Sequence, residues 1–410
     1  MAILTSIPHP ARGSAPRIRR VWRRYVFWLI GGFLALLATV FGLNILFLAR
    51  TNEFVDFNTA VARVKKDGRA LLFNGMNYGF LKEDGFRNAN PVIGSIGSSR
   101  AFLVREQYFT QPFYNLGGSI AGADSLNANN RFSVLNIYFS ARNKTTKLLF
   151  VFMDYWWFTV EEPNSTPSVI GQGQRGNGNG RTAWFATDHP LAKFIRTASI
   201  PTRLVMQNNL QMEQYFGAIM GRYPTVIGDI ETFGIAATLW HNGFDVDGSY
   251  YYGLKAPEDA QCLSQMADFS GWGRVFLSGQ RLDQGKLDEF REAVYSMKKH
   301  GVDVILIIPP VAPPAVKYLQ QPEFAYVDEW RQYMRETFSN VWDFHDPLGL
   351  PSEPCEFIDV IHGGEVTYLR ILKKIAADRP DLLPMLRMDR IDRTINENSG
   401  NRFVVKHVAE

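Results

Sequence analysis

Residue types that can carry out acyl transfer stand at two distant places in the chain. Gly97-Ser98-Ser99-Arg100 closes an apolar run, and Asp359 and His362 lie three residues apart far downstream. A serine hydroxyl becomes a nucleophile when an imidazole takes its proton, and a carboxylate can orient that imidazole. Ser99, His362 and Asp359 therefore form a candidate catalytic triad, with Ser98 as the alternative nucleophile.

Groups that would surround a reacting ester also have candidates. An oxyanion needs positioned N–H donors, and the amides of Ser99, Gly117 and Gly118 could supply them. Arg100 has two interpretations, a contact to an anionic or sugar substrate and a structural clamp on a nearby carboxylate. Both interpretations stay open at the level of sequence.

These residues need a scaffold that brings distant segments together. Five apolar runs, bounded by turn residues and alternating with helical patterns, predict an α/β fold with a five-stranded parallel sheet in which both faces are covered. The predicted strands are Val92–Ile96, Phe113–Leu116, Leu148–Met153, Val302–Ile308 and Val341–Phe344. The predicted helices are Arg131–Arg142, Gly285–His300, Glu329–Phe338 and Glu365–Ala377, and Gly301 is a plausible end of the second.

The third and fourth strands are separated by far more residues than a crossover helix needs. We therefore expect a large insertion at about residues 154–300 within a domain that covers residues 91–385. The stretch Asn164–Arg181 is rich in Gly, Asn, Gln and Ser, so it predicts either a flexible linker or an active-site lid. Residues 50–90 are interpreted as a connector and residues 386–410 as a peripheral tail.

The N-terminal region predicts a membrane anchor. Residues 25–49 contain no charged side chain, and about 20 apolar residues suffice to cross a bilayer. Six arginines precede them in residues 1–24, which predicts a cytoplasmic tail and places the remainder outside the cytoplasm. A cleaved signal peptide is the alternative, but its apolar core is usually shorter and Phe47-Leu48-Ala49 is a poor cleavage site.

Overall charge excludes one class of partner. The net charge is +4, but without the six N-terminal arginines 38 basic and 40 acidic residues remain. A nucleic-acid surface needs a basic face on the folded part of the protein, so we expect no nucleic-acid partner. Cys262 and Cys355 could pair outside the cytoplasm or stay as buried thiols, and two cysteines without neighbouring histidines do not predict a zinc site.

The order of the motifs resembles the SGNH (GDSL-type) hydrolase superfamily over roughly residues 88–380. Gly97-Ser98-Ser99 matches its nucleophile block, Gly117 or Gly118 its oxyanion glycine, and Asp359 with His362 its last block. The resemblance implies a three-layer sandwich of the SGNH or flavodoxin-like type. The GSSR form behind one membrane helix is similar to an envelope branch that includes D-alanyl-lipoteichoic-acid transfer and alginate O-acetylation proteins.

One position departs from the family pattern. Its third block supplies an asparagine that donates to the oxyanion, whereas Asp154 follows the third predicted strand here. An ionised carboxylate cannot donate. Either Asp154 is protonated in a dry pocket, or it orients another residue, or a neighbour such as Tyr155 or Trp156 replaces it.

Together these features predict a membrane-anchored extracytoplasmic serine esterase or O-acyltransferase. The resemblance implies a small acyl group, such as acetyl, on an envelope glycan or acylated polymer, with no cofactor and no metal. The alternative is a non-catalytic SGNH-like accessory protein that works with a membrane acyltransferase or synthase. A membrane-tethered lipase is a third option.

Several other clusters are interpreted as structural. His345 lies between two acids but ends a predicted strand, and Asp245-Val246-Asp247-Gly248 lacks the later glutamate of a calcium loop. The proline pairs after residue 308 are expected to end the fourth strand. The aromatic residues could stack on sugars, although such clusters are more often core; they are Tyr155, Trp156, Trp157, Phe158 and Trp184.

Overall fold

The computed structural model describes residues 15–75, 81–118, 145–160, 190–253, 275–350 and 352–404. The chain divides into two compact units, one of Met1–Arg50 with Thr182–Arg222 and one of Thr51–Arg181 with Tyr223–Glu410. Four predicted features lie outside the described residues, namely the helix Arg131–Arg142, the loop Asn164–Arg181, Trp184 and Cys262.

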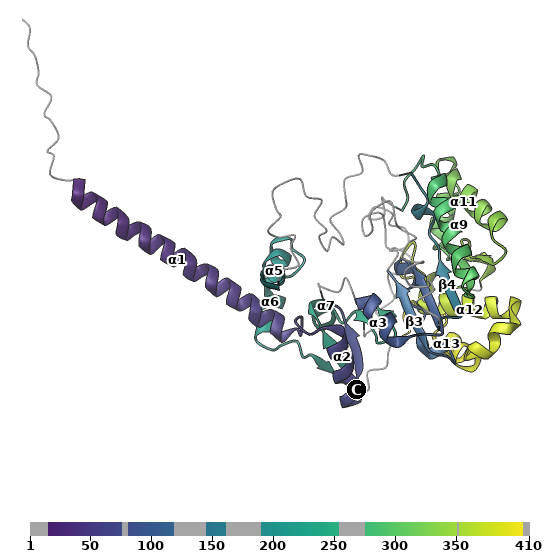
Figure 1. Cartoon of the computed structure of the whole chain (residues 1–410), viewed down its shortest axis with the longest axis horizontal. Helices are drawn as coiled ribbons and strands as arrows, with labels where there is room; N and C mark the ends of the chain where they lie inside the picture. The colour runs from purple at the N-terminus through teal and green to yellow at the C-terminus, as the bar shows by residue number, and fades with distance from the viewer. Residues whose placement is uncertain are drawn as a thin grey trace, which may run out of the picture. The chain divides into compact units, whose positions relative to one another are not determined.

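The larger unit contains a five-stranded, all-parallel sheet, which confirms the predicted α/β class (Figure 1). The strand order is β10-β9-β4-β2-β3. Each strand falls on a predicted run, within one or two residues at its ends. The bounds are β2 Ile93–Gly97, β3 Phe113–Gly117, β4 Leu148–Phe152, β9 Asp303–Ile308 and β10 Val341–Asp343.

Alternate side chains of each strand enter different apolar clusters. Val304, Leu306 and Ile308 of β9 join the cluster that includes α9 (Gln284–Lys299) and α11 (Ala325–Thr337). Ile305 and Ile307 join the cluster that includes α12 (Glu365–Asp378). Burial on both faces explains why these strands read as continuous apolar runs.

Local signals set the helix ends. Asp283 caps α9 by accepting a hydrogen bond from the Lys286 amide, and Gly301 follows the helix with a left-handed φ of 82°. The prolines after β9 lie where the chain leaves the sheet, and Pro313 begins α10 (Pro313–Leu319). The prediction that they end the fourth strand is confirmed.

A second five-stranded sheet was not predicted. Its order is β5-β6-β1-β7-β8, and β1 pairs in parallel with β6. The interpretation of residues 50–90 as a connector is therefore wrong, because this segment forms α2 (Phe57–Asp67), β1 (Ala70–Phe73) and α3 (Leu81–Ala89). The partner elements come from between β4 and β9 in the chain: β5 Val226–Ile227, β6 Ile230–Phe233, α7 Ile235–Trp240, β7 Gly243–Phe244 and β8 Tyr250–Tyr251.

The segment interpreted as a peripheral tail also belongs to the fold. It forms α13 (Met388–Asn398), whose Ile391 is fully buried and whose Ile395 is 7% exposed. Both side chains pack in the cluster that contains α12. Two buried isoleucines four residues apart form one apolar stripe on an otherwise largely polar helix, and the interpretation as a peripheral tail is wrong because it overlooked this stripe.

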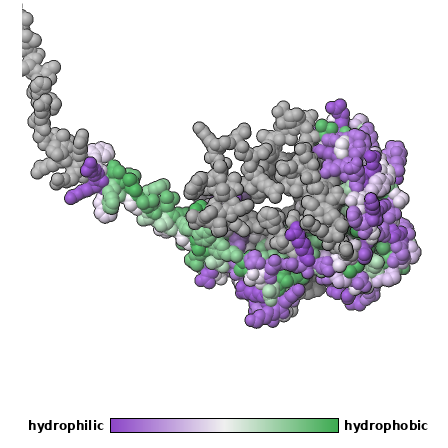
Figure 2. Space-filling model, viewed as in Figure 1, coloured by the Kyte–Doolittle hydropathy of each residue, from purple (hydrophilic) through white to green (hydrophobic). Residues whose placement is uncertain are grey.

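The smaller unit is built on α1 (Ala15–Arg50), with α5 (Pro190–Met206) and α6 (Met212–Ile219). Trp22–Arg50 has a mean hydropathy of 2.3 and is long and apolar enough to cross a membrane. Figure 2 shows this helix as a nearly continuous hydrophobic surface after its basic start. Near its C-terminal end, Phe47 and Leu48 are fully buried.

Candidate functional site

The topology of the main sheet predicts where a ligand would bind. If the five strands are numbered by their order in the chain, their order across the sheet is 2-1-3-4-5. The second strand, β3, therefore lies on one side of the first strand, β2, and the later strands lie on its other side. In open parallel sheets, ligands bind beyond the carboxyl ends of the strands at this reversal. Ser99 follows β2. Asp154 follows β4, the strand that pairs with β2 on the side opposite to β3.

The turn after β2 presents Ser99. Ser98 caps the short 3-10 helix η1 (Ser99–Ala101) by accepting a hydrogen bond from the Arg100 amide. Gly97 is required just before this turn, because a Cβ there would lie 2.8 Å from the Phe152 carbonyl oxygen. Ser98 is buried, whereas Ser99 is partly exposed.

The structure brings Ser99, His362 and Asp359 into hydrogen-bond contact. Ser99 Oγ lies 2.7 Å from His362 Nε2, and the two Asp359 carboxylate oxygens lie 2.9 and 2.8 Å from His362 Nδ1. An ionised carboxylate only accepts, so Nδ1 carries the proton and Nε2 is left to accept from the serine. This is the tautomer that a serine nucleophile needs in a histidine base.

A tight loop before α12 holds the acid and the base. Asp359 Oδ1 accepts hydrogen bonds from the amides of Ile361 and His362, each at 2.9 Å, and the Ile358 amide donates to the His362 carbonyl. Burial alone would raise the pKa of Asp359, but the His362 charge and these hydrogen bonds outweigh it and hold the pKa below its ordinary value. Asp359 is therefore ionised at neutral pH.

Arg100 occupies a structural position. Its guanidinium is 1% exposed, lies 2.9 Å from Asp154 Oδ1, and donates to the carbonyls of Pro309 and Pro310 at 2.6 and 2.7 Å. The expectation that Arg100 holds a substrate is wrong, because Nη1 and Nη2 bind the protein and the side chain is buried, which leaves no exposed surface for a ligand. The alternative interpretation as a clamp is the one that the structure supports.

Asp154 is the partner of that clamp rather than an oxyanion donor. It is fully buried, and burial raises its pKa while the Arg100 charge and hydrogen bonds from Ser98 and Arg100 oppose the rise. Facing a buried guanidinium, the carboxylate accepts hydrogen bonds. Of the three roles left open by the sequence, the contact with Arg100 supports the one in which Asp154 orients another residue.

The two glycine amides expected in the oxyanion hole already have partners. Gly117 N–H donates to Asn115 Oδ1 at 2.6 Å, and Gly118 N–H donates to the carbonyls of Gly97 and Ser98 at 2.9 and 3.0 Å. The expectation that these amides are free donors is therefore wrong. Within the described part of the chain, the Ser99 amide has no hydrogen-bond acceptor and remains the available donor.

Asn115 is a residue that the sequence reasoning missed. It is fully buried in β3, and its Nδ2 donates to the carbonyls of Ala101 and Val104 at 2.7 Å each. It thereby links β3 to the segment that follows Ser99. Its place at the start of Asn-Leu-Gly-Gly was the available signal.

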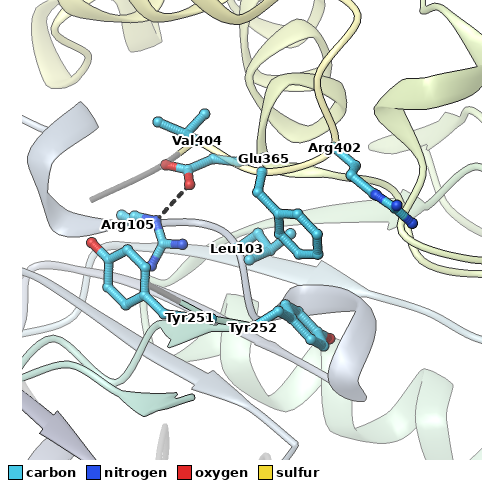
Figure 3. Close-up of a pocket in the computed structure, with 9 residues that line it drawn as sticks. Leu103, Arg105, Tyr251, Tyr252, Glu365, Arg402 and Val404 are labelled. Atoms are coloured by element: carbon cyan, nitrogen blue, oxygen red, sulfur yellow. Dashed lines mark ion pairs between the residues drawn. The ribbon is translucent and has the colours of Figure 1, made fainter. Parts of the chain in front are cut away.

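A polar pocket lies beside the triad in the same unit. Tyr252 has its ring centroid 6.4 Å from that of His362 and lines a small pocket of about 10 Å³ (Figure 3). Arg105 Nε is 2.8 Å from Glu365 Oε2, and its guanidinium carbon lies 3.6 Å from the centroid of the Tyr251 ring. No spacing in the sequence connects these residues, because they come from three distant segments.

The clusters interpreted as structural are structural in this fold. His345 is buried, and desolvation lowers its pKa to about 3, so it is neutral at pH 7. Asp247 accepts hydrogen bonds from the Ser249 and Glu106 amides, which confirms a turn. Tyr155, Trp157 and Phe158 lie in the core, while Trp156 contacts the Arg100 guanidinium.

Comparison with known proteins does not assign this chain to a family. No family model matches it, and no curated protein matches its sequence. Among the described residues, no group of three or more histidine, cysteine or acidic side chains could hold a metal ion. The chemistry of the site must be inferred from its own geometry.

Proposed function

We propose that this protein is a serine-dependent acyl-ester enzyme that forms an acyl intermediate on Ser99. The observation that carries the proposal is the continuous contact from Ser99 through His362 to Asp359. His362 would take the serine proton as Ser99 attacks the ester carbonyl, and would then return it to the leaving alcohol. Water or a sugar hydroxyl would release the acyl group, giving hydrolysis or transfer.

The resemblance to SGNH hydrolases refines this proposal. It implies a three-layer sandwich with an insertion after the third strand of the main sheet, β4. It further implies a small acyl group, such as acetyl, carried by an envelope glycan or a similar polymer. The partly exposed Ser99 at the sheet reversal is compatible with a substrate that approaches from solvent.

We also propose that α1 anchors the enzyme in the membrane with its N-terminus in the cytoplasm. The exposed apolar surface of the helix supports the anchor, and the six arginines within residues 12–24 support this orientation. Phe47 and Leu48 are fully buried, so cleavage near Ala49 would remove side chains from a packed core. The disulfide at Cys355 is typical of proteins outside the cytoplasm.

Labelling with a serine-directed phosphonate tests the nucleophile. We expect Ser99→Ala to lose both labelling and turnover of an acetyl-ester reporter. The matched control is Ser98→Ala, because Ser98 precedes Ser99 and its hydroxyl caps η1 and hydrogen-bonds Asp154; that variant should still be labelled. Labelling of Ser99→Ala at the native level would refute the assignment, and its loss in Ser98→Ala alone would move the nucleophile to Ser98.

A second candidate function is an accessory protein that binds an acylated polymer without reacting. The amides of Gly117 and Gly118 already donate hydrogen bonds within the protein, which leaves few donors for an oxyanion and favours this candidate. This candidate predicts co-purification with a membrane acyltransferase and no acyl-enzyme detectable by mass spectrometry. An acyl adduct mapped to Ser99 would exclude it.

A further inference from the structure

The three helices of the smaller unit present large apolar side chains that are exposed. Large side chains on and next to α5 and α6 are exposed, as is one face of α1, and an open groove of about 590 Å³ lies between α1 and α5. The exposed residues are Phe194, Ile195, Met206, Met212, Phe216 and Met220. A surface of this kind marks contact with an apolar phase or a partner.

We infer that α5 and α6 are embedded in the membrane interface, with these side chains among the lipid acyl chains of the leaflet nearest Arg50. The inference rests on the proposed anchoring by α1. A bilayer core of about 30 Å is crossed by about 20 helical residues, so a span that starts near Tyr25 reaches the opposite interface near Asn44. The level of Asn44 on α1 is therefore the level of the membrane boundary.

Contacts place α5 and α6 at that level. The Phe41 and Phe194 rings lie 6.0 Å apart between centroids, and Phe47 stacks on Tyr215 of α6 at 5.0 Å. Phe41 lies within the apolar span, so Phe194 and its neighbour Ile195 lie beside residues that face lipid. Arg196 and Arg203 of α5 would extend their charged ends to the headgroups while their stems stay in apolar surroundings, and Arg203 lines the groove beside Leu37 and Val40.

The side-chain amide of Asn44 finds all its hydrogen-bond partners within these three helices, as an apolar environment requires. Asn44 Nδ2 donates to the Ala198 carbonyl and to Thr202 Oγ1, each at 2.8 Å, and Asn44 Oδ1 accepts from the Tyr215 hydroxyl at 2.8 Å. Both donors of the amide and its oxygen are thus satisfied inside the unit. Helices that associate in membranes use such amide contacts, because no water is present to replace them.

Fluorescence quenching in proteoliposomes tests the inference on the full chain. A fluorophore would be attached to Ile195→Cys on α5, to Phe216→Cys on α6 and, as reference, to Leu34→Cys on the exposed face of α1. Each label would be exposed to a quencher carried on lipid acyl chains and, separately, to aqueous iodide. We expect the labels on α5 and α6 to lose fluorescence to the lipid quencher as the Leu34 label does, and to be shielded from iodide.

The reference separates failure of this inference from failure of the anchor. If the Leu34 label escapes the lipid quencher, α1 does not span the membrane. If it is quenched but the labels at Ile195 and Phe216 respond to iodide alone, the anchor stands and the embedding of α5 and α6 is refuted. Shielding of both labels from both quenchers would mean that a second copy of the chain covers them, which also refutes the lipid contact.

Discussion

At the level of single residues, the proton on the His362 ring is controlled by Asp359. Both carboxylate oxygens contact Nδ1, and one of them also accepts hydrogen bonds from the amides of Ile361 and His362. The same carboxylate therefore holds both the imidazole ring and the loop that carries it. As a result, the other ring nitrogen, Nε2, can accept the hydrogen bond of the Ser99 hydroxyl. In the proposed mechanism, the reactivity of Ser99 thus depends on Asp359, which it does not contact.

The Asp359→Asn variant separates this orienting role from the shape of the loop. An asparagine can still accept the Ile361 and His362 amides, but its NH2 group favours the wrong ring tautomer. We expect kcat for an acetyl ester to fall by about 10³ to 10⁴ with little change in KM. A loss smaller than tenfold would mean that Asp359 does not orient the base.

The lowered pKa of Asp359 also predicts a pH dependence of stability. Because the folded-state pKa lies below the ordinary value of 3.8, the carboxylate stabilises the folded protein above that pH, and the contribution disappears as pH falls through the folded value. The free energy of unfolding should therefore differ more between the native protein and Asp359→Asn at about pH 6 than at about pH 3. Denaturant titrations at both pH values measure this difference, and an equal difference at both would contradict the prediction.

At the level of elements, the Ser99 turn is anchored to three strands. Arg100 links the end of β2 to Asp154 after β4 and to two carbonyls after β9, and Asn115 links β3 to the segment after η1. These contacts are buried, so each donor lacks a water that could replace its partner. The turn is held by the edge of the sheet rather than by its own sequence.

Removal of the Arg100 side chain should therefore destabilise the fold strongly. Arg100→Ala leaves the Asp154 carboxylate and two carbonyls buried without partners, and we expect a loss of about 3–5 kcal/mol in the free energy of unfolding. The matched control is Lys374→Ala, which breaks an exposed pair with Asp378 and should cost less than about 1 kcal/mol. Equal effects in chemical denaturation would show that the buried clamp is not a structural link.

The helix α13 is a part of the same fold that can be tested separately. Ile391→Ala removes a fully buried side chain from the cluster with α12, and we expect a loss of about 2–5 kcal/mol. Asn396→Ala, at an exposed position of the same helix, should change stability by less than about 0.5 kcal/mol. If the two variants unfold at the same denaturant concentration, α13 is peripheral after all.

At the level of the whole molecule, the proposed anchor decides on which side of the membrane the serine works. An extracytoplasmic catalytic unit would meet envelope polymers and an oxidising environment, whereas the six arginines within residues 12–24 would stay in the cytoplasm. The two parts of the chain then have different surroundings.

Labelling of intact cells tests this topology. A cysteine introduced at the exposed position Asn396 should react with a membrane-impermeant maleimide added outside, while an N-terminal epitope tag should resist external protease until the membrane is opened. Reaction at position 396 only after permeabilisation would place the catalytic unit in the cytoplasm. That outcome would overturn the proposed substrate class as well as the orientation.

The sequence by itself determined the strands of the main sheet, the apolar helix and the residues of the triad. Each of these rests on a local property, such as a continuous apolar run or an Asp-x-x-His spacing, that a linear reading can detect. Tertiary structure decided the rest, because β1 becomes a strand by pairing with β6, about 160 residues away in the chain. In the same way, Arg100 became a clamp and the Gly117 and Gly118 amides lost their expected role because distant segments supplied their partners, which no spacing in the chain encodes.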